Sequence, residues 1–200
     1  MPIRERRERD RARRQQLIVT AARELAEAEG WEAVTTRRLA ERVEYSQPVL
    51  YSHFTGKAGI VRAVALEGFG DLAAELRSAR TAADSPVAAL RALAAAYLCF
   101  AQSHPAVYDA MFVMTIDLPF AVPGTPAAPR AAFAELLAAL TPLAGDRDLE
   151  TLGEVAWSAL HGLATLARSN RLRASHHQGR LDLLVDQLTG RPAQHRPGRP

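Results

Sequence analysis

Apolar residues recur at helical spacing along almost the whole chain, and the alternating pattern of a half-buried strand is almost absent. Segment 17–26 is the first clear example, because its apolar residues fall in pairs four positions apart and form one stripe on a helix. Comparable segments continue to residue 188, without internal repeats. The pattern predicts an all-α fold of about nine helices.

The first three predicted helices are closely spaced. Gly30 is placed to end the first helix, Thr35 to cap the second, and Ser46 to cap the third, with Pro48 in its first turn. The turn between the second and third helices has only three or four residues. This spacing predicts a helix-turn-helix, whose last helix fits the major groove of DNA.

The excess of positive charge lies in the same part of the chain. Residues 1–60 hold 12 Lys and Arg against 9 Asp and Glu, whereas residues 61–200 hold 13 against 13. A polyanion is therefore expected to meet the first third of the chain. Segment 4–14 is rich in arginine but also contains Glu5, Glu8 and Asp10. A solvated helix extension and a minor-groove arm are equally compatible with that composition.

Residues in and around the third helix have side chains suited to DNA. Gln47 can pair with adenine, and Val49 can meet a thymine methyl group. Arg37 can reach a guanine edge or a phosphate, and hydroxyl groups and the single lysine suit phosphate oxygens. The predicted DNA-binding residues are Thr36, Arg37, Gln47, Pro48, Val49, Tyr51, Ser52, His53 and Lys57.

This stretch resembles the DNA-binding head of the TetR family of bacterial regulators over about residues 13–65. The resemblance is carried by two runs, Val34-Thr-Thr-Arg-Arg-Leu-Ala-Glu-Arg-Val and Gln47-Pro-Val-Leu-Tyr-Ser-His-Phe-Thr-Gly-Lys. It implies a cytoplasmic transcriptional regulator that binds double-stranded DNA. One residue departs from the family pattern, since Glu44 stands in the turn where glycine is usual. Glu44 must adopt a left-handed backbone at some cost or reshape the turn.

Two later segments resemble the WHG-type C-terminal domain of a branch of these regulators, namely His104-Pro-x-x-Tyr-x-x-Met-Phe and Trp157-x-x-x-His-Gly. That resemblance implies dimerisation and the sensing of a small molecule. Aromatic and thioether side chains in this region are suited to lining an apolar pocket, although ordinary core packing explains them equally well. The predicted effector-binding residues are Tyr97, Phe100, Tyr108, Met111, Phe112, Met114, Trp157 and His161.

The eighth and ninth predicted helices are more apolar than one small body requires, and they are the predicted homodimer surface. Two heads related by a two-fold axis would read a palindromic operator with half-sites about 34–36 Å apart, or a multiple of that distance. A largely apolar effector would then release the repressor. The predicted divisions are a basic arm at 1–12, the helix-turn-helix at 13–60, the ligand-binding and dimerisation body at 61–190, and a disordered tail at 191–200.

Motifs of other functional classes are absent from the sequence. It has no glycine-rich phosphate loop, no Gly-x-Ser-x-Gly and no His-Glu-x-x-His, so no enzymatic activity, cofactor or metal site is predicted. The sequence contains no run of 18 apolar residues, so no membrane span is predicted. Cys99 is the only cysteine, which excludes an intramolecular disulfide and fits a reducing compartment.

Two alternatives remain open from the sequence. One is a DNA-binding dimer of the same fold that responds to no small molecule, and a filled core in the body would favour it over an enclosed cavity. The other is a helical enzyme or carrier with a vestigial head. Absent or salt-independent binding to duplex DNA would favour that reading.

Overall fold

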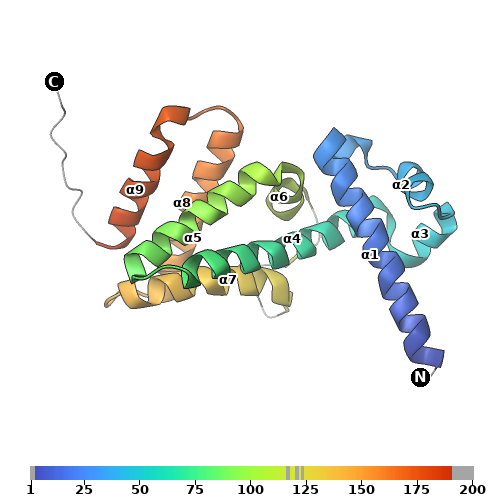
Figure 1. The fold of residues 1–200 in the computed structure, drawn as a ribbon, viewed down its shortest axis with the longest axis horizontal. Coiled ribbons are helices and arrows are strands. Elements are labelled where there is room, and N and C mark those ends of the chain that lie inside the picture. The colour runs from blue at the N-terminus through green and yellow to red at the C-terminus, as the bar shows by residue number, and fades with distance from the viewer. Residues whose placement is uncertain (1–2, 116–117, 120–121, 123, 191–200) are drawn as a thin grey trace. The chain divides into compact units, whose positions relative to one another are not determined.

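The protein is described by a computed structural model that covers residues 3–115, 118–119, 122 and 124–190 (Figure 1). Helices account for nearly all of the secondary structure in these residues, and the described part contains no strand. The α-helices are α1 (Ile3–Glu29), α2 (Thr36–Arg42), α3 (Gln47–His53), α4 (Gly56–Thr81), α5 (Pro86–Ser103), α6 (Pro105–Phe112), α7 (Ala127–Leu140), α8 (Leu149–Arg168) and α9 (His177–Leu188). The short 3-10 helices are η1 (Trp31–Ala33), η2 (Thr141–Leu143) and η3 (Ala174–His176). The predicted all-α fold is confirmed.

Local signals in the sequence explain several helix ends. Gly30 follows α1 with a φ of 81°, and its amide donates to the carbonyl of Ala26. The hydroxyl of Thr35 accepts the amide of Arg38 and caps α2. Ser46 occupies the corresponding position before α3, but its side chain accepts no capping hydrogen bond. The third helix begins there with Pro48 in its first turn, where a missing amide hydrogen costs nothing.

The chain forms two compact units, of which the first contains Met1–Phe69 and His104–Pro126. In this unit α1 packs against α2 and α6, and α2 packs against α3. Ile18 of α1, Leu39 of α2 and Leu50 of α3 are almost fully buried. Their burial fixes the three helices to one another although α2 and α3 have only seven residues each.

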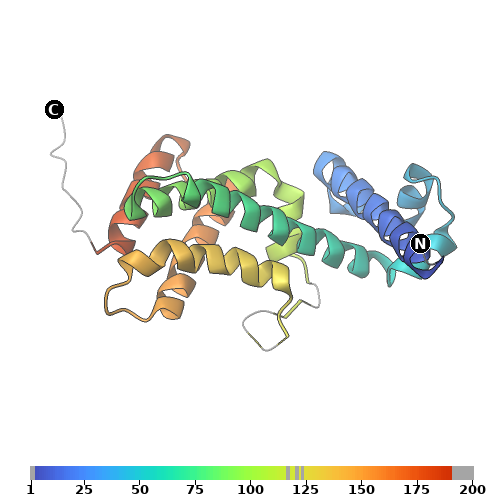
Figure 2. The ribbon, with the colours of Figure 1, turned by 60° about the horizontal axis from the view of Figure 1, so that its bottom comes forward.

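The second unit contains Gly70–Ser103 and Ala127–Pro200, and α5 is its central helix. It packs against α7, α8 and α9, and the helices of this unit are seen from another side in Figure 2. By length and composition α5 is also the one described helix apolar enough to cross a membrane. Seven of its residues are buried in this unit, so its apolar character is that of a core helix.

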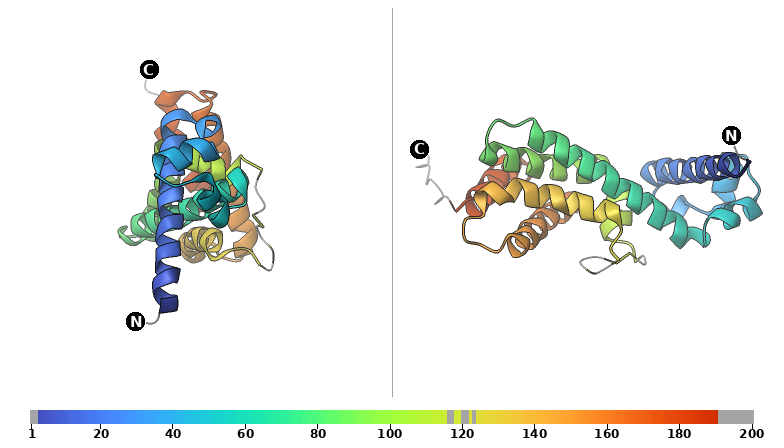
Figure 3. Two further views of the ribbon diagram at one scale, coloured as in Figure 1. Left: turned by 90° about the vertical axis from the view of Figure 1, so that its right-hand side faces the viewer. Right: turned by 90° about the horizontal axis from the view of Figure 1, so that it is seen from below.

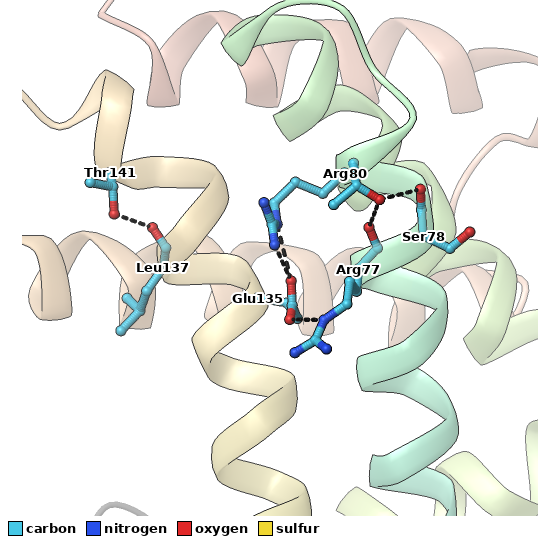
Figure 4. A network of polar contacts seen from close by, with 7 residues as sticks. Arg77, Ser78, Arg80, Glu135, Leu137 and Thr141 are labelled. Carbon is cyan, nitrogen blue, oxygen red and sulfur yellow. Dashed lines mark hydrogen bonds and ion pairs between the residues drawn. The ribbon is translucent and has the colours of Figure 1, made fainter.

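A charged cluster joins α4 and α7 within the second unit (Figure 4). Glu135 is 4% exposed and accepts hydrogen bonds from Nε of Arg77 at 2.7 Å and from Nη2 of Arg80 at 2.6 Å. Burial raises the pKa of Glu135, but the bonds from Arg80 and Arg77 outweigh it and hold that pKa below its ordinary value. The carboxylate is thus ionised at neutral pH and ties the last turns of α4 to α7.

The compact units differ from the division predicted along the chain. Segment 104–126 packs with the N-terminal residues, and α4 passes from the first unit to the second at residue 70. The predicted arm at 1–12 is, from Ile3 onwards, the first part of α1. The predicted tail at 191–200 lies outside the described residues. The functional boundaries predicted from the sequence remain predictions.

Candidate nucleic-acid interface

The turn between α2 and α3 is closed by two backbone hydrogen bonds. The amide of Tyr45 donates to the carbonyl of Ala40 at 3.0 Å, and the amide of Glu44 donates to that of Glu41 at 3.4 Å. This pair of bonds defines a Schellman motif, which needs a left-handed residue after the helix. Glu44 supplies it with a φ of 57°. The departure from glycine is therefore accommodated by backbone strain rather than by a different turn.

Four of the predicted residues on α3 reach solvent, whereas Val49 is half-buried. Gln47, Pro48, Tyr51 and Ser52 are exposed, and the side chain of Tyr51 retains 57% of its accessible surface. Leu50 on the opposite face is buried and anchors the helix. The alternation follows from helical periodicity and leaves a polar helix face open to a ligand as large as DNA.

Two predicted phosphate-binding hydroxyls from different helices lie close together. Oγ1 of Thr36 at the start of α2 is 3.5 Å from Oη of Tyr51 on α3. Arg37 is exposed beside them, and its Nε donates to Glu41 at 3.0 Å. An exposed ion pair of this kind contributes at most about 1 kcal/mol, so Arg37 can exchange Glu41 for an anionic partner at little cost.

Two ion pairs between residues without regular spacing also join α2 to α1. Both terminal nitrogens of Arg38 donate to the carboxylate of Glu29, at 2.8 and 2.9 Å. Arg42 pairs with Glu24 at 3.0 Å. The bond from Arg38 holds the pKa of Glu29 below its ordinary value. These four residues have no motif spacing, so only the packed structure brings them together.

Lys57 lies in the first turn of α4, and its ammonium has a protein partner. Nζ donates to the carbonyl oxygen of Trp31 at 2.5 Å. An ammonium has three donors, so this bond leaves Lys57 able to contact a phosphate as well. The contact also fixes η1 to the start of α4.

His53, at the end of α3, is less exposed than the other predicted residues. Its Nδ1 is buried and has no hydrogen-bond partner among the described residues. Burial lowers the pKa of His53, and the positive charges of Arg11 and Arg14 lower it further. The ring is thus neutral at pH 7. Because Arg11 also donates to the carbonyl of Ser52 at 3.4 Å, the N-terminal part of α1 reaches the end of α3.

The first unit also ties α1 to α6. The carboxylate of Glu27 accepts the amides of Ala106 and Val107, at 3.1 and 3.0 Å, in the first turn of α6. Nε1 of Trp31 donates to the carbonyl of Ala106 at 2.8 Å. The helix-turn-helix thereby shares a rigid contact with α6, the helix that contains three of the predicted effector-binding residues.

The predicted effector-binding residues are divided equally between the two compact units. Tyr108, Met111, Phe112 and Met114 belong to the first unit, whereas Tyr97, Phe100, Trp157 and His161 belong to the second. Tyr97, Phe100, Tyr108 and Met111 are buried, and the other four are partly exposed. In the first unit the Tyr108 and Phe112 rings lie 4.8 Å apart between centroids.

Trp157 and His161 share one face of α8, as their spacing predicts, with ring centroids 6.3 Å apart. Burial lowers the pKa of His161, and Arg168 adds to the effect. A groove of about 270 Å³ elsewhere in the second unit is lined by other residues, among them Arg80, Ser85 and Pro142. That groove therefore does not coincide with the predicted effector site.

Two family models match the chain, one in each functional part. Residues 18–64 match the bacterial regulatory proteins of the tetR family, and residues 90–190 match the tetracyclin repressor-like C-terminal domain. The chain belongs to the TetR family. It is accordingly a DNA-binding transcriptional regulator, and the family's members usually act as dimers with small-molecule effectors. Transcriptional regulators of this family are not enzymes.

Relatives and solved structures agree with this membership. The HTH-type transcriptional regulator Rv0681 of Mycobacterium tuberculosis is 32% identical over 74% of this chain and 67% of its own length. The class C tetracycline repressor protein of Escherichia coli is 46% identical over 24% of this chain and 22% of its own. A Rhodococcus sp. RHA1 protein of unknown function is 25% identical with a TM-score of 0.73, covering 88% of this chain and 93% of that one.

A second solved structure shares the fold alone. FadR of Bacillus subtilis, solved in complex with stearoyl-CoA, is 12% identical with a TM-score of 0.63. The alignment covers 85% of this chain and 97% of FadR.

Proposed function

We propose that this regulator is a homodimeric repressor that reads a palindromic operator through α3 and leaves it when a small, largely apolar effector binds. The observation that carries the proposal is the exposed polar face of α3. On the opposite face, Leu50 is buried and holds the helix in place. Such a helix enters the major groove with short side chains toward the bases. A DNA-binding regulator acts where the chromosome lies, so we place the protein in the cytoplasm.

The predicted residues divide into two kinds of contact. Gln47 and Val49 read base edges, the former by paired hydrogen bonds to adenine and the latter by contact with a thymine methyl group. Thr36 and Tyr51 hold one phosphate between them, which their separation of 3.5 Å supports. Pro48, Ser52 and His53 line the groove, while Arg37 and Lys57 bind the backbone on either side of α3.

The homodimer forms through α8 and α9. Val155 and Leu166 on α8 are 57% and 40% exposed, and Leu183 on α9 is 47% exposed. Exposed aliphatic residues on two adjacent helices are typical of an isologous interface. Gly162 lies on α8 between the first two, and an added Cβ there would meet open space, so that a partner helix has room to approach.

We propose that effector binding weakens operator binding through a displacement of α6. FadR, which shares this fold, was solved with an acyl-CoA, and that ligand class supports an apolar effector here. Displacement of α6 by an effector would act directly on α1, because Glu27 and Trp31 bind the first turn of α6. The operator-binding state is lost in proportion to the effector's preference for the displaced arrangement.

Selection of bound duplexes from a random pool tests the operator proposal. The expected result is a palindrome whose half-site centres lie one helical turn, or a multiple of it, apart. Tyr51→Phe should weaken binding to all sequences, whereas Gln47→Ala should also relax the preference at one base pair per half-site, costing about 1–3 kcal/mol. Recovery of no consensus, or of an unchanged one with Gln47→Ala, would contradict the proposed reading.

The dimer and effector have separate tests. Leu166→Arg should shift the protein to monomer in sedimentation, and Thr165→Arg beside it serves as a control for added charge. A compound that binds in calorimetry and leaves operator affinity unchanged would refute release by that compound and support the alternative of a regulator without a small-molecule effector.

A further inference from the structure

The N-terminal part of α1 carries arginines on two opposite faces. Arg7, Arg11 and Arg14 are spaced by four and three residues and thus share one face, which is here called the arginine stripe. Arg6, Arg9 and Arg13 lie on the opposite face by the same periodicity. All six side chains are exposed. The chain therefore offers two sets of three exposed arginines that point in different directions.

The structure gives the direction of the stripe. Arg11 donates from Nη2 to the carbonyl of Ser52, one residue before the end of α3. The charges of Arg11 and Arg14 also lower the pKa of His53, the last residue of α3. All of these residues belong to the first compact unit. The stripe thus lies on the side of α1 that faces the end of the recognition helix, and α1 continues beyond it toward the N-terminus (Figure 3).

We propose that the arginine stripe is a second DNA-binding element, which binds backbone phosphates beside the major groove that α3 enters. The inference rests on the proposed operator reading by α3 and extends its footprint. Between Arg7 and Arg14 the helix rises about 10 Å, which corresponds to about three base pairs of duplex. Arg4 lies further toward the N-terminus and forms an exposed ion pair with Glu8 at 3.0 Å, and it is not counted in the stripe.

The helical conformation of the N-terminal part of α1 favours contact with the DNA backbone over insertion into the minor groove. An α-helix with its side chains is about 10–12 Å across, whereas the minor groove of B-DNA is about 6 Å wide. Since α1 is helical from Ile3 onwards, this segment does not enter the minor groove as an extended arm does. Contacts to phosphates raise the affinity for every sequence and carry no base preference.

The test compares two triple variants of the full chain. The stripe variant is Arg7→Gln, Arg11→Gln and Arg14→Gln, and the control is Arg6→Gln, Arg9→Gln and Arg13→Gln. Both remove three charges and keep a residue of similar helix propensity. Circular dichroism and thermal unfolding verify that both remain folded. The affinity of each variant is measured for a duplex selected by the unmodified protein and for a duplex of random sequence. Both measurements are made at salt concentrations between about 50 and 200 mM.

The stripe variant is expected to lose affinity for both duplexes and to lower the slope of log K against log salt by about 2.7 for each arm engaged, at about 0.9 per phosphate. The control variant should retain most of the slope. Hydroxyl-radical protection should shorten by about three base pairs at each flank in the stripe variant only.

Equal losses in the two variants would overturn the inference, because they would show an effect of net charge alone. Unchanged binding in the stripe variant would overturn it as well, while selection of a palindrome by that variant would leave operator reading by α3 intact. Loss of an A·T preference at the flanks would replace phosphate binding by minor-groove insertion. If the unmodified protein selects no sequence, operator reading fails, and the random duplex still tests the stripe.

Discussion

The two sets of predicted site residues differ in how they meet solvent. On α3, Tyr51 is 57% exposed and lies beside residues that also reach solvent. In the predicted effector set, Tyr108 is fully buried and packs against Phe112. The first set lies within one compact unit, on α2, α3 and the start of α4, whereas the second is divided between two compact units.

This difference shows which functional residues a sequence can identify. A DNA-reading helix carries specific polar residues on its solvent-exposed face. These residues can be recognised in the sequence because they differ from the apolar stripe on the buried face. Residues that line an apolar pocket have the same chemistry as residues that fill a core. The effector set therefore remains a prediction, and perturbing matched residues in the two sets is the most direct way to separate a pocket from a core.

The largest contrast is expected between two tyrosine variants. Tyr108→Ala removes a fully buried ring and should lower the free energy of unfolding by about 3–5 kcal/mol. Tyr51→Ala removes an exposed ring and should change it by less than about 0.5 kcal/mol, although it weakens DNA binding. Urea unfolding followed by circular dichroism measures both. A loss below about 1 kcal/mol for Tyr108→Ala would instead indicate a pliable pocket around this ring.

A pair of glycines on α4 tests the packing around Met111. A Cβ at Gly68 would lie 2.4 Å from Cγ1 of Val107 and 2.8 Å from Sδ of Met111, whereas one at Gly70 would meet nothing within 4 Å. Gly68→Ala should therefore destabilise the protein by about 1–2 kcal/mol, since crowding exceeds the gain in helix propensity. Gly70→Ala should stabilise it by up to about 1 kcal/mol.

Thermal unfolding of the two glycine variants provides the comparison. Similar stabilisation by both would mean that Val107 and Met111 move aside easily, as expected of residues that border a cavity. That outcome would favour the effector-site interpretation of this part of the set.

The ion-pair cluster at Glu135 provides a pH-dependent test in the second unit. Glu135→Gln keeps the shape but loses the charge that Arg77 and Arg80 bind, and it should cost about 1 kcal/mol at pH 7. The folded-state pKa of Glu135 lies below its ordinary 4.5, so the stabilisation is present above that value and is lost as the pH falls through the lower one.

Urea unfolding of the Glu135→Gln variant and the unmodified protein should thus converge as the pH is lowered below the ordinary pKa. A difference that stays constant through that range would show that the charge of Glu135 is not what stabilises the α4–α7 contact. The packing of the Glu135 side chain, and not its charge, would then be what stabilises the contact.

The smallest effect is expected in the turn before α3. Glu44→Gly relieves a left-handed residue, and the greater freedom of glycine in the unfolded chain offsets part of the gain, leaving about 0.5 kcal/mol of stabilisation. Asn170→Gly is the control, because asparagine tolerates its φ of 55° better and should gain less. Thermal unfolding measures both, and an altered operator consensus with Glu44→Gly would show that Glu44 also sets the direction of α3.

Much of the fold followed from local sequence. Periodicity predicted an all-α chain, Thr35 capped α2, and Gly30 ended α1, because each of these depends on neighbouring residues only. Ser46 shows the limit of such rules, since it lies at the N-cap of α3 without a capping side-chain bond. For the turn at Glu44 the sequence left two conformations open, a left-handed residue or a reshaped turn. The folded chain has the left-handed residue.

The sequence by itself determined the family of this protein, the positions of its helices, and a candidate reading face on α3, because these features repeat over a few residues or follow a linear motif. The tertiary structure decided which distant charges meet, such as Arg38 with Glu29 and Arg11 with Ser52. It also decided which side chains are buried and that α6 packs against α1. These contacts join residues without any regular spacing, so they exist only once the helices have packed.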